Sequence, residues 1–259
     1  MRLNVYLQKA GIGSRREAER LVAAGRVCIN GKIADVTMPV ADGDAVTLDG
    51  RTVAPQTKSL PRLFLLHKPV DFLVTHRDPK GRKTIFDLPA LNPPKWPATM
   101  PRVMTVGRLD VNSEGLLLLS SDGPLAQAMM SPETALERVY RVRLRGRLDA
   151  KAIAALARGV ALDGINYRGA ESVEEEGKGG RSNTWYRVVL TEGKNREIRK
   201  LAEHFDCVVN RLIRVQYGLF HLEGLPSGSV KEVAPQRVAE LLAFLRDRRQ
   251  NFETLSLPR

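Results

Sequence analysis

The loop before residues 116–119 carries the side chain best suited to covalent chemistry. An Arg-Leu-Asp triplet, Arg108 to Asp110, stands in a segment bounded by Gly107 and Gly115, and four consecutive leucines follow at once. Such an apolar run between turn residues is typical of a strand buried on both faces, so the Asp110 carboxylate is expected at the edge of the core. There it could act as a nucleophile. It could equally cap its own turn or pair with Arg108.

A tyrosine is expected on the inward face of a strand over residues 138–145. Apolar and charged residues alternate in this segment, which is the pattern of a half-buried strand. Period two places Tyr140 with Val142 and Leu144 on one face, and Arg141 with two further arginines on the other. Because the apolar face must pack inward, Tyr140 points toward the core or a cleft, where its hydroxyl needs a partner.

Two arginines lie at the start of a predicted helix. Its apolar residues occupy the i, i+3, i+4 and i+7 positions of a half-buried helix; they are Ile198, Leu201, Ala202 and Phe205. Asn195 is placed to be the N-cap. Arg196 and Arg199, three apart, would share a face that differs from the packed one.

The sequence contains no other complete catalytic set. It has no paired Ser-His-Asp arrangement, no glycine-rich phosphate loop, and no second carboxylate beside Asp110 that would indicate hydrolysis or cofactor chemistry. The four histidines have no ligand spacing with each other or with the cysteines, so we expect no metal and no cofactor. Covalent catalysis by a carboxylate remains, or RNA binding without catalysis.

The charge balance favours a polyanionic partner. The 259 residues carry a formal net charge of +12, and clustered Lys and Arg bind phosphates by releasing condensed counterions. Cys28 and Cys207 have apolar neighbours and resemble buried hydrophobic residues of a protein in the reduced cytoplasm. No apolar run of about 18 residues is present, and the N-terminus lacks the apolar stretch of a secretory signal. We therefore expect a cytoplasmic protein that does not insert into membranes.

Residues 1–58 are expected to form a small module of two helices followed by strands. A Ser-x-x-Glu capping box from Ser14 to Glu17 opens the second helix, and Asn30-Gly31 favours a two-residue hairpin turn. This arrangement resembles the αL-type RNA-binding domain named after a small-subunit ribosomal protein. The alternative is a small α+β module whose arginines are only solvated. On the first interpretation, the expected RNA contacts are Arg15, Arg16, Arg20 and Lys32.

Three further segments carry expectations of their own. Residues 75–102 are basic and proline-rich, and form either an RNA-contacting flap, with Lys80 and Arg82 on phosphates, or a disordered insertion. Residues 171–183 are charged and glycine-rich and are expected to form a mobile loop. A helix is expected over residues 237–248, followed by a basic tail.

Four blocks after residue 62 resemble the ribosomal branch of the pseudouridine synthases. They are Lys68-Pro69, residues 107–123 with Asp110, Tyr140, and residues 192–199 with Arg199. Residues 185–186 and 209–218 are most similar to the B-type enzymes of large-subunit ribosomal RNA. The resemblance implies an α+β fold: the small RNA-binding domain, then a catalytic domain on a mixed, mainly antiparallel sheet with flanking helices. The expected divisions are 1–58 for the RNA-binding domain, 59–62 for the linker end, 63–240 for the catalytic domain and 241–259 for the helix end and tail.

The resemblance also implies a reaction. The bond from uracil N1 to the ribose is broken, the base rotates, and it is rejoined through carbon 5. Asp110 would be the nucleophile, attacking the anomeric carbon or carbon 6, and the paired Arg199 would favour its ionised form. Tyr140 would stack near the uracil and could relay the carbon 5 proton. Further substrate contacts are expected from Leu212, Lys68, Asn195 and Arg196.

A uridine within folded RNA must leave the base stack before it can reach Asp110. Arg108 either occupies the vacated space or forms a structural salt bridge in its loop. The first hypothesis is therefore a cofactor-independent, monomeric enzyme that isomerises uridine to pseudouridine in ribosomal RNA, with 23S rRNA as the expected substrate. The second is a non-catalytic RNA-binding or ribosome-assembly factor with the same fold. Asp110 discriminates between them, because a silent relative has little reason to keep it beside Arg199 and Tyr140.

Overall fold

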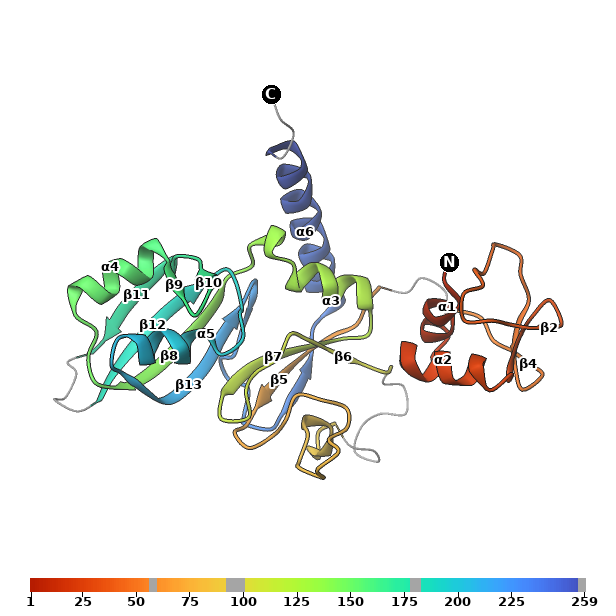
Figure 1. Ribbon diagram of the computed structural model, residues 1–259, viewed down its shortest axis with the longest axis horizontal. Helices are drawn as coiled ribbons and strands as arrows, with labels where there is room; N and C mark the ends of the chain where they lie inside the picture. Colours follow the sequence, from red (N-terminus) through yellow and green to blue (C-terminus); the bar gives the residue numbers. More distant parts are fainter. Residues whose placement is uncertain (56–59, 92–100, 178–182, 256–259) are drawn as a thin grey trace. The chain divides into compact units, whose positions relative to one another are not determined.

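The computed structural model describes residues 1–55, 60–91, 101–177 and 183–255 (Figure 1). The chain divides into two compact units, Met1–Leu60 and Pro61–Arg259. Buried apolar side chains form one core cluster in the first unit and two in the second. Each unit therefore has the packing that an independent domain requires.

The first unit consists of two helices and a small antiparallel sheet in the order β2-β1-β3-β4. The Ser14 hydroxyl accepts a hydrogen bond from the Glu17 amide at 3.2 Å, as a helix N-cap does. Asn30 and Gly31 have φ angles of 51° and 77°, as a type I′ turn requires. The expected helix start and hairpin are confirmed. The elements are α1 (Leu3–Lys9), α2 (Arg15–Ala23), β1 (Val27–Ile29), β2 (Lys32–Ile33), β3 (Val46–Leu48) and β4 (Arg51–Thr52).

The second unit is built on one mixed sheet. Its main path runs β11-β12-β8-β13-β7-β5-β15, with β6 paired to β7 and β14 paired to β13. Only the β13·β7 pair is parallel among the described strand pairs, so the sheet is mainly antiparallel as expected. The strands are β5 (Leu63–Lys68), β6 (Met104–Val106), β7 (Glu114–Ser120), β8 (Arg138–Arg145), β11 (Ser172–Glu176), β12 (Asn183–Leu190), β13 (Val208–Tyr217), β14 (Phe220–His221) and β15 (Val230–Glu232). A separate hairpin joins β9 (Val160–Leu162) to β10 (Ile165–Tyr167).

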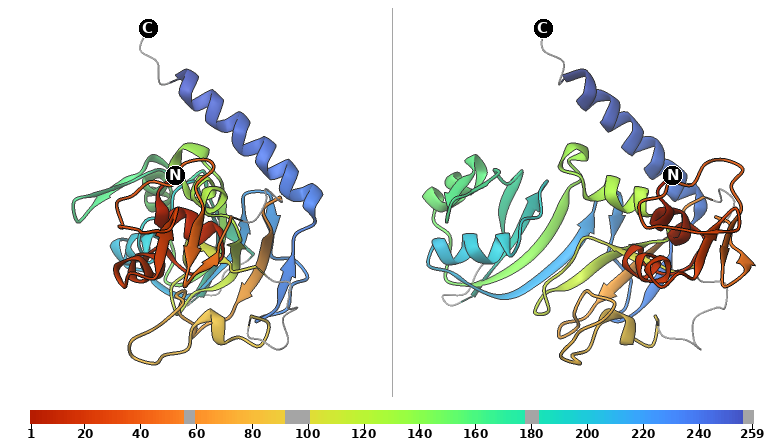
Figure 2. Two further views of the ribbon diagram at one scale, coloured as in Figure 1. Left: turned by 90° about the vertical axis from the view of Figure 1, so that its right-hand side faces the viewer. Right: turned by 45° about the vertical axis from the view of Figure 1, so that its right-hand side comes forward.

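Helices cover both faces of this sheet (Figures 1 and 2). On one face, α4 (Ala150–Arg158) and α5 (Glu197–His204) pack over β8 and β12, and the 3₁₀ turn η1 (Ile85–Asp87) contributes to the same core. On the other face, α3 (Gly123–Met130) and α6 (Pro235–Leu255) pack over β7 and β5, and the 3₁₀ turn η2 (Pro132–Thr134) follows α3. The sheet thus separates two cores, which makes this an α+β fold.

Strand β7 belongs to both cores, as its four leucines predicted. Leu116 to Leu119 are each 0% exposed. Leu117 and Leu119 pack in the core under α4 and α5, whereas Leu116 and Leu118 pack in the core under α3 and α6. Burial of both faces fixes the register of this strand strongly, because a slip by one residue would exchange the two sets. The loop between β6 and β7 is therefore attached to a strand whose position is fixed.

Two expectations about local structure are wrong, and one of the two alternatives for residues 75–102 is excluded in part. Of the two alternatives for residues 75–102, the disordered insertion is wrong for residues 75–91, because η1 inserts Ile85 into the core with 0% exposure; the RNA-contacting flap stays a prediction, and residues 92–100 lie outside the described part. Residues 172–176 form the edge strand β11 rather than a mobile loop, and residues 178–182 are again outside. Helix α6 continues to Leu255, through most of the expected tail.

The cysteine thiols are free, with Cys207 buried and Cys28 partly exposed. No helix within the described ranges is both long and apolar enough to cross a membrane.

Candidate active site

The loop between β6 and β7 holds Asp110 at the rim of a deep hollow. Leu109 anchors the loop in the core with 8% exposure, and the Ser113 amide closes a turn by donating to the Asp110 carbonyl at 3.0 Å. Gly115 follows with φ +107°, and a Cβ there would collide with the backbone of Arg214 on β13. Only glycine allows this close approach of β7 to β13. The Asp110 side chain keeps 33% of its surface exposed.

The buried Lys68 holds this loop through hydrogen bonds to its backbone. Its side chain is 0% exposed, and Nζ donates to the backbone carbonyls of Pro69 at 2.8 Å, Val111 at 3.3 Å and Ser113 at 2.8 Å. Burial lowers the pKa of Lys68 to about 8, although nearby carboxylates, including Asp110, oppose that shift. The expected direct contact between Lys68 and the substrate is not compatible with this position, because all three donors are used inside the protein. We propose instead that Lys68 positions the Asp110 loop.

Two arginines from the α5 region reach Asp110. Arg196 Nη1 lies 3.6 Å and Arg199 Nε lies 3.7 Å from Asp110 Oδ2. Arg199 is the more fixed of the two, because Nη1 donates to the Val209 carbonyl at 3.3 Å and Nη2 donates to the Asn112 carbonyl at 2.9 Å. Burial lowers the pKa of Arg199, and the Asp110 carboxylate acts in the opposite direction. The expected pair of arginines on one face thus converges on the expected nucleophile.

The expected N-cap of α5 is wrong by one residue. Arg196, not Asn195, is the N-cap, and its φ of 53° is left-handed. A non-glycine residue in this region costs free energy and persists only where the surroundings hold it. The left-handed turn starts α5 at Glu197 while Arg196 reaches Asp110, so the strain lies in the segment that forms the site. Asn195 stays exposed on the wall of the hollow.

The hollow in front of Asp110 has a volume of about 970 Å³. Tyr140 and Leu212, with 8% and 7% exposure, line it from neighbouring strands, and the exposed Arg108 lies on its rim. Arg108 forms no ion pair with Asp110 or with any other residue of the described ranges, so local pairing of the triplet is not observed. Nor does the hollow offer a metal centre: no cluster of three potential metal-ligating side chains occurs within the described ranges.

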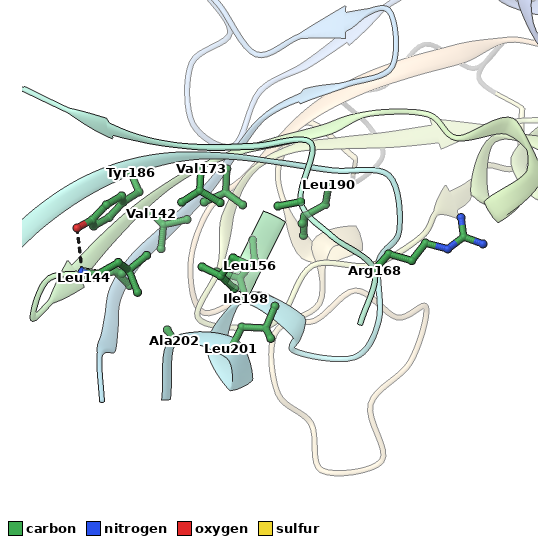
Figure 3. Close-up of a pocket in the computed structure, with 13 residues that line it drawn as sticks. Val142, Leu144, Leu156, Arg168, Val173, Tyr186, Leu190, Ile198, Leu201 and Ala202 are labelled. Carbon is green, nitrogen blue, oxygen red and sulfur yellow. Dashed lines mark hydrogen bonds between the residues drawn. The ribbon is translucent and has the colours of Figure 1, made fainter. Parts of the chain in front are cut away.

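A separate apolar cavity lies beneath α5, with a volume of about 40 Å³ (Figure 3). Ile198, Leu201 and Ala202 close it from the helix side, and the Tyr186 hydroxyl accepts a hydrogen bond from the Leu148 amide at 3.0 Å beside it. Its walls carry no carboxylate, and the Arg168 side chain extends away from it (Figure 3). This cavity belongs to the packing that holds α5 on the sheet, and it is not a second reaction site.

The comparisons with known proteins agree with this geometry. Residues 62–204 match the family described as RNA pseudouridylate synthase, and residues 1–56 match the S4 domain. A Rickettsia felis protein described as an uncharacterized RNA pseudouridine synthase is 40% identical over 233 residues, which cover 90% of this chain and 96% of that protein. This chain belongs to the RNA pseudouridylate synthase family.

The relatives of this chain differ in length. Ribosomal large subunit pseudouridine synthase B of Yersinia pestis is 41% identical over 245 residues, covering 90% of this chain and 72% of that protein. The protein of the same name from Xanthomonas campestris is 42% identical over 255 residues, but this chain spans only 50% of its length. A crystal structure of a pseudouridylate synthase, 22% identical, superposes with a TM-score of 0.63 over 93% of this chain and 99% of that chain, which supports the fold.

The basic residues that we expect to bind RNA are surface side chains in both units. Arg16, Lys32 and Lys80 are exposed. Three arginines already have protein partners: Arg15 donates to Gln8 at 3.1 Å, Arg20 lies 3.5 Å from Glu17, and Arg82 holds Asp78 with two hydrogen bonds of 2.9 and 3.1 Å. The Arg20–Glu17 pair is exposed on both sides and contributes little stability, so an RNA phosphate can replace Glu17 at small cost. Arg82 is held more firmly, because the Asp78 side chain is only 6% exposed. The roles of all these basic residues stay predictions.

A buried carboxylate pair supports the segment that carries Arg196. Glu192 and Glu197 are 8% and 4% exposed. Glu192 accepts from the Arg168 amide at 2.7 Å and from Lys194 Nζ at 2.6 Å, whereas Glu197 accepts from the Lys194 amide at 2.9 Å. Burial, followed by the nearby Glu192 carboxylate, raises the pKa of Glu197 to about 7. The pKa of Glu192 is lowered despite its burial, through Lys194 and the Arg168 amide. The pair was not found from the sequence.

The raised pKa of Glu197 predicts a pH-dependent stability. Its value is about 7 in the folded state and 4.5 ordinarily, so the stabilisation is complete below about pH 4.5 and is lost as the pH rises toward about 7. We expect Glu197→Gln to flatten the decline of Tm between pH 5 and pH 7, because the amide stays neutral. Thermal unfolding at several pH values measures this. Glu203→Gln, an exposed change on the same helix, is the matched control, and an equal flattening there would contradict the assignment.

Two buried arginines in the hollow were also missed. Arg138 and Arg214 are 5% and 3% exposed and line the same hollow as Asp110. Their spacing in the sequence could have revealed them, because Arg138 is two residues from Tyr140 and Arg214 is two residues from Leu212. Alternation with period two therefore places both guanidinium groups on the inward face of the sheet, where a charged group is costly unless it is paired or hydrogen-bonded.

Proposed function

We propose that this protein isomerises a specific uridine of large-subunit ribosomal RNA to pseudouridine. The observation that carries the proposal is the pairing of Asp110 with Arg196 and Arg199 at the rim of a hollow lined by Tyr140 and Leu212. Family membership and the names of the relatives from Yersinia pestis and Xanthomonas campestris support the reaction and the substrate class.

The proposed reaction needs no redox partner, because substrate and product are isomers. The Asp110 carboxylate attacks the anomeric carbon or carbon 6 of uracil, and the bond from N1 to the ribose is broken. The base rotates, carbon 5 forms the new bond to the ribose, and the bond to Asp110 is broken, which restores the free carboxylate. Carbon 5 then loses its proton while N1 gains one. Tyr140 lies against the base and is placed to relay the carbon 5 proton. Arg199 holds Asp110 in position and favours its ionised form, and Leu212 packs against the base.

Access to Asp110 requires the target uridine to leave its stack, at a cost of a few kcal/mol. The hollow of about 970 Å³ has room for a nucleotide, and Arg108 on its rim forms no ion pair among the described residues that would have to break before it enters the RNA. The S4 domain supplies further phosphate contacts, which position the RNA rather than react with it.

A non-catalytic RNA-binding or assembly factor is the competing function. Binding alone does not require an aspartate between two arginines, an inward tyrosine and a strained left-handed residue in one hollow. Such strain is typical of functional sites. The arrangement therefore favours catalysis.

The test is to map pseudouridine across ribosomal RNA from cells that lack this protein. We expect the loss of modification at one or a few positions of the large-subunit RNA, restored by the wild-type gene but not by Asp110→Asn. If every position stays modified in the deletion strain, or if the loss falls in another class of RNA, the proposed substrate is wrong.

A further inference from the structure

Arg138 and Arg214 place two positive charges deep in the hollow without a carboxylate partner. Neither guanidinium forms a salt bridge with any residue in the part of the chain that the structure describes. The Tyr217 ring lies close to both, with each Cζ 4.9 Å from the ring centroid. A buried cation costs several kcal/mol unless it is paired and its donors are satisfied. The two arginines meet these requirements to very different degrees.

Both terminal nitrogens of Arg138 have hydrogen-bond partners within the protein. Nη1 donates to the carbonyls of Leu136 at 3.1 Å and Thr191 at 2.7 Å, and Nη2 donates to the Tyr217 hydroxyl at 3.0 Å. That hydroxyl in turn donates to the Met129 carbonyl at 3.0 Å. Arg138 is therefore a structural residue that ties β8 to β13 and α3.

Arg214 has donors left over. Nε donates to the Leu116 carbonyl at 2.8 Å, which fixes the side chain against β7. Nη2 is buried without a hydrogen-bond partner, and Nη1 has none among the described residues. Since most buried polar atoms are paired, an orphan guanidinium end in a substrate hollow indicates a ligand that completes it. Arg214 lies directly across from Tyr140 in the β13·β8 register, so that ligand would lie next to the reacting base.

We propose that Arg214 binds the phosphodiester of the flipped target nucleotide and thereby positions its ribose at Asp110. This inference rests on the proposed function. The free edge of a guanidinium presents two parallel N–H donors, which suits two phosphate oxygens. A phosphate also brings the negative charge that the hollow lacks there, because the Asp110 carboxylate is already engaged by Arg196 and Arg199. A uracil carbonyl would accept one hydrogen bond but would leave the charge of Arg214 unpaired.

The experiment removes the guanidinium of Arg214 and the charge of the phosphate separately and then together. The probe is a synthetic hairpin that contains the uridine identified by the mapping, made with a normal or a neutral methylphosphonate linkage at the target nucleotide. Full-length wild type, Arg214→Met and Arg138→Met are compared by Kd and by single-turnover rate, with thermal unfolding as the check on folding. Because the mapping establishes the reaction first, failure here would concern Arg214 alone.

We expect the methylphosphonate to weaken wild-type binding about tenfold and to change binding by Arg214→Met less than twofold. Arg138→Met is expected to lower Tm while keeping the full sensitivity to the methylphosphonate. Arg214→Lys should restore part of that sensitivity, because it returns the charge without the second donor. Equal sensitivity in wild type and Arg214→Met would overturn the proposal. A second outcome would also overturn it. If Arg214→Met altered the effect of a 4-thiouridine at the target on binding, but not the effect of the methylphosphonate, Arg214 would contact the base rather than the phosphate.

Discussion

Asp110→Asn binds the target RNA with at least wild-type affinity and forms no detectable pseudouridine. The amide has the shape of the carboxylate but is a far poorer nucleophile, so the covalent step is lost and the single-turnover rate falls by about 10⁴-fold or more. Binding does not suffer, because Arg196 and Arg199, now without their anion, face the RNA with their full positive charge. Single-turnover pseudouridine formation and Kd for the same hairpin measure both effects.

The matched control for Asp110→Asn is Glu114→Gln. Glu114 is a carboxylate at the end of the same loop, where it pairs with Arg211 on β13. Its loss removes one negative charge from the same region without touching the hollow, so the rate is expected to stay within about threefold of wild type. Measurable turnover by Asp110→Asn would show that Asp110 is not the nucleophile, and a comparable loss in Glu114→Gln would reduce the effect to local charge.

Arg199→Lys slows the reaction by about 10²-fold, although it keeps the positive charge. The guanidinium of Arg199 joins three parts of the site: its Nη groups hold the carbonyls of Val209 and Asn112 while Nε faces Asp110. An ammonium is a single point charge and cannot bridge these partners at once. The carboxylate then loses its fixed orientation, and misplacement by about 1 Å can cost this much in rate.

Arg196→Lys is the control for that change. Arg196 contacts the same Asp110 oxygen, but its side chain is 52% exposed and has no hydrogen bond to the backbone among the described residues. A lysine there keeps the electrostatic contribution, so the rate is expected to fall less than about fivefold. Rates of both variants with saturating RNA measure the contrast. Equal effects would mean that charge near Asp110, rather than its orientation by Arg199, governs the reaction.

The sequence by itself determined the features that depend on near neighbours in the chain. Four leucines predicted a strand buried on both faces, alternation placed Tyr140 inward, and Asn30-Gly31 predicted a hairpin turn. Periodicity and turn chemistry act over a few residues, so they can be derived without knowledge of the fold. The motifs around Asp110 and Arg199 were sufficient for the family as well.

Only the tertiary structure decided what these side chains touch. Packing of α5 against the sheet brings Arg196 and Arg199 to Asp110, and antiparallel pairing places Arg214 across from Tyr140. Lys68 holds the catalytic loop because it binds the carbonyls of Val111 and Ser113, which lie in the distant connection between β6 and β7. Contacts between distant segments depend on register and packing, which no local pattern encodes. The carboxylate and its pairing with Arg199 were therefore expected from the sequence, whereas the positions of Arg196, Lys68 and Arg214 around the site came from the fold.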